Sequence, residues 1–137
     1  LRLIMWKYCG VIKNKSLLSQ GLKSIEIIQN KLKNIDVRID ENNCEDLTLT
    51  FDLQSSLISA KATIISAMER NESRGAHQRS DFETINPSFK YNCVVSMDFK
   101  NGNLKVSKSP LKKLNKYLKN IISNANKDED IRNKLLE

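Results

Sequence analysis

Apolar residues recur every three or four positions in two long stretches of the chain. In Ser16–Ile39 the recurring positions are Leu18, Leu22, Ile25, Ile28, Leu32, Ile35 and Ile39. This spacing predicts a helix that buries one face, with Ser16 as a candidate N-cap. A shorter apolar pattern over residues 1–9 stops at Gly10 and predicts a short helix before it.

The second long stretch, Glu45–Asn71, carries two apolar stripes. One consists of Leu49, Leu53, Leu57, Ala60, Ile64 and Met68, and the other of Phe51, Ile58, Ala62 and Ile65. A face this wide predicts a helix in contact with two neighbours, and its many serines and alanines would let another helix approach closely. The polar run Asp40–Asn43 predicts the connection between the two long helices.

After a charged, irregular segment the pattern changes to strict alternation. Strands are predicted at Tyr91–Phe99 and Asn103–Val106, around the turn sequence Asn101-Gly102. Pro110 then precedes a third amphipathic helix, near its first turn, with apolar positions at Leu111, Leu114, Leu118 and Ile121. A polar break from Asn126 leads into a short last helix at about Asp130–Leu136.

These elements predict a mainly α fold, an antiparallel three-helix-type bundle with a β-hairpin insertion and a short C-terminal helix. We divide one domain over residues 1–137 into the bundle (1–71), the motif loop (72–87), the hairpin (91–107) and the terminal helices (110–136). Since the first residue is Leu1 and not methionine, we expect a fragment of a longer protein. No apolar run approaches the roughly 20 residues that span a bilayer, so no direct membrane insertion is expected.

Charge and cysteine content exclude several kinds of site. Lysine and arginine exceed aspartate and glutamate by 23 to 16, but the lysines, Lys13 among them, are dispersed without interleaved aromatics. We interpret them as a solvated face and expect no nucleic-acid partner. The widely spaced Cys9, Cys44 and Cys93 form no C-x-x-C pair, so they predict reduced, buried thiols in a reducing compartment and no metal site.

Residues 69–82 (ERNESRGAHQRSDF) depart from the rest of the chain. They hold Arg70, Arg74 and Arg79, three of the six arginines, and the only histidine, His77. Because lysine outnumbers arginine 17 to 6, this concentration indicates a use for the planar, multidentate guanidinium group. Carboxylate partners are present in Glu69, Glu72 and Asp81, and Gly75 offers a positive-φ position at which a helix can end.

Three interpretations of this segment remain open. It could be a charge-paired loop that caps the long helix, or a docking loop that meets another domain or subunit through its arginines. A catalytic loop with His77 as acid or base is the third, and it lacks an accompanying nucleophile, second histidine or metal cluster.

The same segment resembles a known signature. Its residues Glu72, Ser73, Arg74, Gly75, Ala76, His77, Arg79, Asp81 and Phe82 match the E-S-R-G-A-H-x-R-x-D-[FY] motif of the C-terminal helical domain of succinate dehydrogenase and fumarate reductase flavoprotein subunits. L-aspartate oxidase and adenylylsulfate reductase share related forms. The start of the chain is similar to the family's M-W-x-x-x-G-V-x-R-x-x-x-x-L pattern, with Lys13 at the basic position. The resemblance covers residues 1–86 well and the hairpin loosely, and the family's proline after the motif is displaced to Pro87.

The resemblance implies that the parent protein holds FAD in an upstream Rossmann-like domain and passes hydride between a dicarboxylate and flavin N5. We expect none of that chemistry here, because the four glycines are isolated and form no dinucleotide fingerprint. No catalytic, cofactor-binding or metal residue is therefore assigned to this fragment. The motif residues Glu72, Ser73, Arg74, Gly75, His77, Arg79 and Asp81 are assigned to a docking loop.

The resemblance also implies partners and a location. The expected partners are the upstream FAD domain and an iron–sulfur subunit, and an exposed docking face leaves self-association of the fragment open. The expected location is the cytoplasm, including the cytoplasmic side of a membrane reached through a complex. The alternatives are the C-terminal domain of L-aspartate oxidase, which works without an iron–sulfur partner, a free-standing helical interaction module, and a basic nucleic-acid binder.

Overall fold

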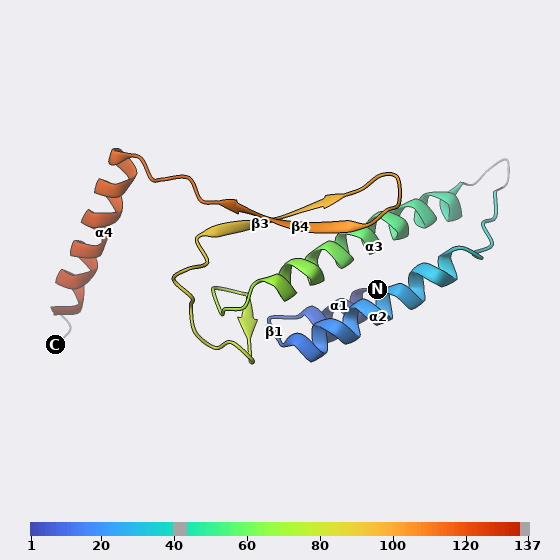
Figure 1. Ribbon diagram of the computed structural model, residues 1–137, viewed down its shortest axis with the longest axis horizontal. Helices are drawn as coiled ribbons and strands as arrows, with labels where there is room; N and C mark the ends of the chain where they lie inside the picture. The colour runs from blue at the N-terminus through green and yellow to red at the C-terminus, as the bar shows by residue number, and fades with distance from the viewer. Residues whose placement is uncertain (40–43, 135–137) are drawn as a thin grey trace.

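The computed structural model describes residues 1–39 and 44–134. Its elements, in chain order, are α1 (Arg2–Cys9), β1 (Ile12–Lys13), α2 (Lys15–Leu32), α3 (Glu45–Glu69), β2 (Gln78–Arg79), β3 (Tyr91–Met97), β4 (Leu104–Pro110) and α4 (Lys116–Lys134). Helices α2 and α3 run side by side in opposite directions, α1 packs beside them, and the β3–β4 hairpin lies along α3 (Figure 1). The predicted mainly α fold with a hairpin is confirmed.

The core lies between the three N-terminal helices. Its buried apolar residues are Leu18, Ile25, Leu57, Ala60, Ile64 and Ala67, all from α2 and α3. Gly21 permits the close approach of these helices, because a Cβ there would lie 3.0 Å from both the Ile64 Cδ1 and the Tyr8 Cβ. The predicted apolar spacing therefore identifies the buried face over most of both long helices, but Leu49 and Phe51 near the start of α3 are 56% and 60% exposed.

Helix α2 begins and ends earlier than its apolar pattern predicts. Its N-cap is Asn14, whose side-chain oxygen accepts a hydrogen bond from the Leu17 amide at 2.9 Å, so the predicted cap at Ser16 is wrong. The helix ends at Leu32, and Ile35 and Ile39, which continue the spacing, are 47% and 61% exposed. Further helical turns would therefore bury little apolar surface at these two positions, and β-branched residues add little helix propensity of their own. The predicted connection at 40–43 lies outside the described residues.

The hairpin is present, with a longer second strand than predicted. The strands pair antiparallel from Tyr91 opposite Pro110 to Met97 opposite Leu104. Gly102 takes a φ of +70° in the turn, a conformation that glycine adopts without strain. Pro110 ends the second strand instead of preceding a helix, and a proline is tolerated there because the strand lies at a sheet edge.

The C-terminal part differs most from the prediction. A single helix, α4, replaces the two predicted helices, and residues 111–115 are not helical. Its backbone continues through Asn126 and Asp130, where a break was predicted, because polar residues are tolerated in a helix that faces solvent. The described side chains from 111 to 125 are all exposed, and α4 stands apart from the bundle (Figure 1). The predicted end at Leu136 lies outside the described residues.

Among the residues that the structure describes, no helix is both long and apolar enough to cross a membrane. In the same residues, no three His, Cys, Asp or Glu side chains cluster in a way that could hold a metal ion. The cysteines are free thiols, but the prediction that all three are buried is wrong, because Cys44 is exposed at the start of α3 and Cys9 and Cys93 are half-buried.

Candidate functional site

The motif loop folds back against the end of α3 and the start of α2. A tight turn at Gly75, with a φ of +57°, brings Arg74 and His77 opposite each other. The Arg74 amide donates to the His77 carbonyl at 2.8 Å, and the His77 amide donates to the Arg74 carbonyl at 3.0 Å. The chain then enters β2, which pairs in parallel with β1 and so joins the loop to the segment before α2.

Arg79 and Asp81 connect the two long helices. Arg79 is 2% exposed, and its Nε and Nη2 donate to the two Asp81 carboxylate oxygens at 2.7 and 2.8 Å. Its Nη1 donates at 2.8 Å to the carbonyl of Ala67, at the C-terminal end of α3. Asp81 Oδ2 also accepts from the Lys15 amide at 3.0 Å, at the first turn of α2. The Arg79 guanidinium holds the pKa of Asp81 well below its usual range.

Glu72 is the centre of a second charged group. Its side chain is fully buried and accepts hydrogen bonds from Arg70, from Nε and Nη2 of Arg74 at 3.1 Å each, and from the Asn86 amide at 2.9 Å. The pKa of Glu72 is lowered to about 2, chiefly by the hydrogen bonds from Arg74, against the opposing effect of burial. The same contact raises the pKa of Arg74, whose side chain remains 48% exposed.

Ser73 and His77 hold the backbone of the loop. The Ser73 Oγ accepts from the Arg79 amide and donates to the Phe82 carbonyl, both at 2.8 Å. His77 Nε2 donates to the Arg70 carbonyl at 3.0 Å. Burial lowers the pKa of His77, and the positive charges of Lys13, Arg79 and Arg70 lower it further, which favours the neutral imidazole that makes this hydrogen bond.

The seven assigned motif residues (Glu72, Ser73, Arg74, Gly75, His77, Arg79 and Asp81) thus lie in one continuous structure. Arg79, Asp81 and Glu72 find their partners within the chain, as in the charge-paired loop that was one of the three interpretations. Of the three arginines, Arg74 is the one with a half-exposed side chain. The hydrogen bond that His77 makes with its side chain joins Nε2 to the Arg70 carbonyl, so the ring holds the backbone of the loop.

Sequence reasoning missed Lys13. The sequence interpretation placed this lysine on a solvated face, but it is 5% exposed. It lies in β1, where its backbone is in register with that of Arg79 in β2. The signal that could have identified it is its place at the basic position of the pattern around Gly10 and Val11.

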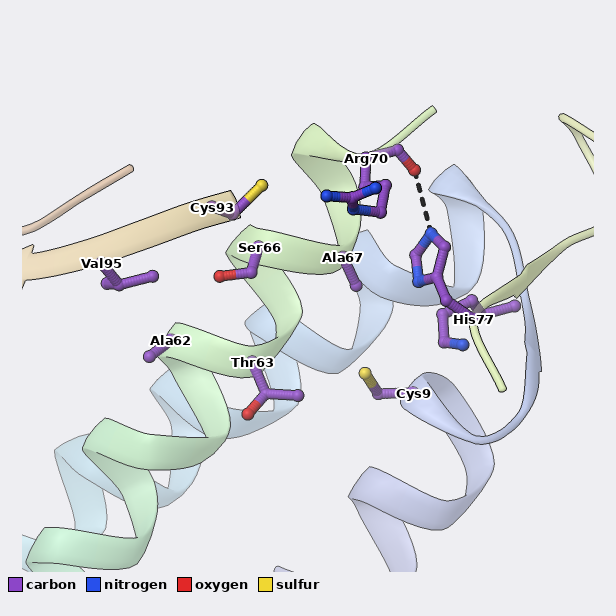
Figure 2. A pocket seen from close by; sticks show the side chains of 10 residues that line it. Cys9, Ala62, Thr63, Ser66, Ala67, Arg70, His77, Cys93 and Val95 are labelled. Atoms are coloured by element: carbon purple, nitrogen blue, oxygen red, sulfur yellow. Dashed lines mark hydrogen bonds between the residues drawn. The ribbon is translucent and has the colours of Figure 1, made fainter. Parts of the chain in front are cut away.

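A cavity of about 570 Å³ opens beside Lys13, between α1, α3 and β3. Figure 2 shows Cys9 from α1 and Cys93 from β3 on two of its sides, with His77 and Arg70 at one end. The wall formed by α3 is made of small side chains, Ala62, Thr63, Ser66 and Ala67. We refer to this cavity as the Lys13 pocket.

Comparison with known proteins gives a match to one family model over most of the chain. The model is described as the fumarate reductase flavoprotein C-terminal region, and it matches residues 1–126. A mitochondrial succinate dehydrogenase flavoprotein subunit of Xenopus laevis is 36% identical over 98 residues, 66% of this chain and 14% of that protein. An L-aspartate oxidase of Pyrococcus abyssi is 32% identical over 90 residues, 66% of this chain and 15% of that protein.

Solved structures show the same arrangement. The quinol fumarate reductase of E. coli superposes with a TM-score of 0.71 and 28% identity, covering 82% of this chain and 20% of that one. The chain thus spans only 14% to 18% of the length of these curated relatives.

Proposed function

Because this chain belongs to the fumarate reductase flavoprotein C-terminal family, we propose that it is the C-terminal domain of an FAD-dependent dicarboxylate oxidoreductase of the succinate dehydrogenase and fumarate reductase type. The observation that supports this most directly is the family match over residues 1–126, which includes the whole charged network of the motif loop. The domain contributes structure to the parent enzyme and no catalytic group of its own.

The 137 residues do not themselves suit FAD. A dinucleotide site needs clustered glycines after a buried parallel strand, whereas Gly10, Gly21, Gly75 and Gly102 are isolated. The described parallel pairing, between β1 and β2, is only two residues long. We therefore assign the flavin and its reaction to the part of the parent protein outside residues 1–137.

We propose that the domain packs against the FAD domain and an iron–sulfur subunit. The outer face of α1 supports this, because Leu3 and Trp6 are 84% and 80% exposed. We also propose that the motif loop takes part in this docking through Arg74, whose guanidinium is held by Glu72 at one edge and is half exposed. The complex would operate in the cytoplasm, including the cytoplasmic side of a membrane.

The parent protein, expressed from the gene region upstream of Leu1 together with residues 1–137, tests the assignment. We expect flavin absorbance and oxidation of succinate or reduction of fumarate with an artificial electron carrier. A protein with no bound flavin and no dicarboxylate turnover would contradict the proposal and favour a free-standing helical module.

An L-aspartate oxidase is the second candidate, since the Pyrococcus abyssi enzyme is nearly as similar to this chain as the succinate dehydrogenase subunit. Two measurements separate the candidates. Oxidation of L-aspartate by the purified flavoprotein alone would favour the oxidase. Co-purification with an iron–sulfur subunit, together with succinate oxidation, would favour the dehydrogenase.

The docking role of the motif loop is tested by Arg74→Lys in the parent enzyme. Lysine keeps the charge but loses the fork that binds Glu72 and a partner at once, so we expect weaker assembly with the flavin chemistry unchanged. Arg38→Lys, at an exposed arginine outside the motif loop, is the matched control. Normal assembly with a collapsed turnover rate would contradict the docking role.

A further inference from the structure

Lys13 is a buried cation that has no carboxylate partner among the residues that the structure describes. Its ammonium donates to the Val11 carbonyl at 2.8 Å. The ion pairs among the described residues are Arg70–Glu72, Arg74–Glu72, Arg79–Asp81 and Lys108–Glu69, and none of them includes Lys13. Buried lysines are normally paired, so the Lys13 pocket holds a positive charge that this part of the chain does not neutralise.

Lys13 interacts electrostatically with the Cys9 thiol and with Arg79, and the motif loop next to it holds more arginines than buried carboxylates. Within the motif loop and the adjoining Arg70, three arginines share two buried or half-buried carboxylates, Glu72 and Asp81. Arg79 faces Lys13, and burial is the main reason why the pKa of Lys13 is lowered. The C-terminal end of α1, which stops at Cys9, adds only the partial negative charge of a helix terminus. Lys13 and the three arginines thus carry two more positive charges than Glu72 and Asp81 neutralise.

The walls of the pocket indicate what kind of anion would fit. Ala62, Ala67 and Val95 are apolar, Cys9 and Cys93 contribute weakly polar thiols, and Thr63 and Ser66 add two small hydroxyl side chains. Arg70 already donates to Glu72 and to the Tyr91 carbonyl at 2.6 Å, so it offers no free fork for a phosphate, which prefers bidentate arginine or a helix N-terminus. A single carboxylate on a short aliphatic body matches one ammonium and apolar walls.

We propose that the Lys13 pocket is a binding site for one carboxylate group, which pairs with the Lys13 ammonium. Its volume of about 570 Å³ lies within the range of small-molecule sites. The carboxylate comes either from a small aliphatic acid in solution or from an aspartate or glutamate side chain outside residues 1–137. This inference does not depend on the flavin reaction and can fail or succeed separately from it.

The three cysteines allow a direct test with the 137-residue chain. Cys9 and Cys93 line the pocket, whereas Cys44 is exposed elsewhere. We expect sodium butyrate, compared with sodium chloride at equal ionic strength, to slow alkylation of Cys9 and Cys93, by about tenfold at ten times the dissociation constant. Alkylation of Cys44 should not change. Sodium phosphate should protect less than butyrate does.

Variants assign the effect to Lys13. Lys13→Met should abolish the protection, and Lys13→Arg, which keeps the charge, should retain it. Lys7→Met, at an exposed lysine of α1, should behave like the unsubstituted chain. Circular dichroism tests whether each variant is folded. If Lys13→Met does not fold, Lys13→Arg and the comparison of butyrate with phosphate still decide whether the pocket binds a carboxylate.

The longer parent protein identifies the source of the carboxylate. Protection of Cys9 and Cys93 without added acid, and unchanged by butyrate, indicates a side chain of the parent itself. Protection that appears only with butyrate indicates a free acid. Equal protection by chloride, phosphate and butyrate, no protection in the 137-residue chain, or undiminished protection in Lys13→Met would each overturn the proposal.

Discussion

Arg79 and Glu72 are both buried and carry opposite charges, yet they do not pair with each other. Arg79 binds Asp81 and the carbonyls that end α3, and Glu72 binds Arg70 and Arg74. Removing one partner of a buried pair leaves an uncompensated charge, which costs far more than the pair itself gains. These contacts explain why this short segment uses arginine in a lysine-rich chain. The planar guanidinium of Arg79 binds both oxygens of a carboxylate and helix carbonyls at once, which an ammonium group does not do.

Arg79→Lys should reduce the free energy of unfolding by about 2 to 3 kcal/mol, because lysine keeps the charge but cannot replace the fork. Urea denaturation of the 137-residue chain measures this change. Arg38→Lys, at an exposed position, should change it by less than about 0.5 kcal/mol. An equally small change in Arg79→Lys would show that the network contributes no net stability.

The lowered pKa of Glu72 should make the stability of the folded chain depend on pH. Its pKa is lowered from 4.5 to about 2 in the folded chain, so its contribution is fully present above the unfolded value and is lost as the pH falls through the folded value. We expect the free energy of unfolding to decline between about pH 5 and pH 2.

The comparison of Glu72→Gln with Glu83→Gln isolates this effect. Glu72→Gln should show a shallower decline with falling pH, whereas Glu83→Gln, at an exposed carboxylate, should follow the unsubstituted chain. Identical slopes in all three proteins would mean that acidification acts through other groups.

At the scale of the elements, sequence reasoning succeeds where local pattern decides and fails where distant contacts decide. Helix α3 and the hairpin turn follow from apolar spacing and Asn101-Gly102. The acceptance of the Lys15 amide by Asp81, 66 residues away, depends on the folded loop. The Asn14 cap is a local contact with the Leu17 amide, which apolar spacing alone did not distinguish from a cap at Ser16. The end of α2 likewise depends on which neighbours are present, and no local pattern records that. Lys13 is different, because its place at the basic position after Gly10 and Val11 did mark it in the sequence.

The same limit applies to α4. Its apolar positions predicted a packed helix after Pro110, but Leu118 and Ile121 are 43% and 47% exposed. We therefore expect truncation after Asn115 to change the free energy of unfolding of the remaining chain by less than about 0.5 kcal/mol. Urea denaturation of the shortened chain measures it, and a loss of several kcal/mol would show that α4 packs on the bundle.

At the scale of the whole molecule, apolar surface is distributed unevenly. The inner faces of α2 and α3 are buried, but Leu3 and Trp6 on α1 are largely exposed. The same helix contributes Cys9 to the Lys13 pocket. Apolar surface of this kind on one element typically marks an interface. Since the chain spans about a sixth of the length of its relatives, the parent protein can supply what covers α1.

Trp6 reports on this interface because it is the chain's single tryptophan. In the 137-residue chain, where it is 80% exposed, acrylamide should quench its fluorescence strongly. In the parent protein the Trp6 signal is obtained as the difference from Trp6→Phe, and we expect its quenching constant to be several times smaller. The control is the double variant Trp6→Phe with Phe99→Trp, whose tryptophan lies at the hairpin turn, where Phe99 is 90% exposed. Strong quenching of this tryptophan in both proteins would show that the protection of Trp6 is specific to α1. Equal quenching of Trp6 in the two proteins would place the domain contact on another face, and the exposed side of α1 would then be surface that the parent also leaves in solvent.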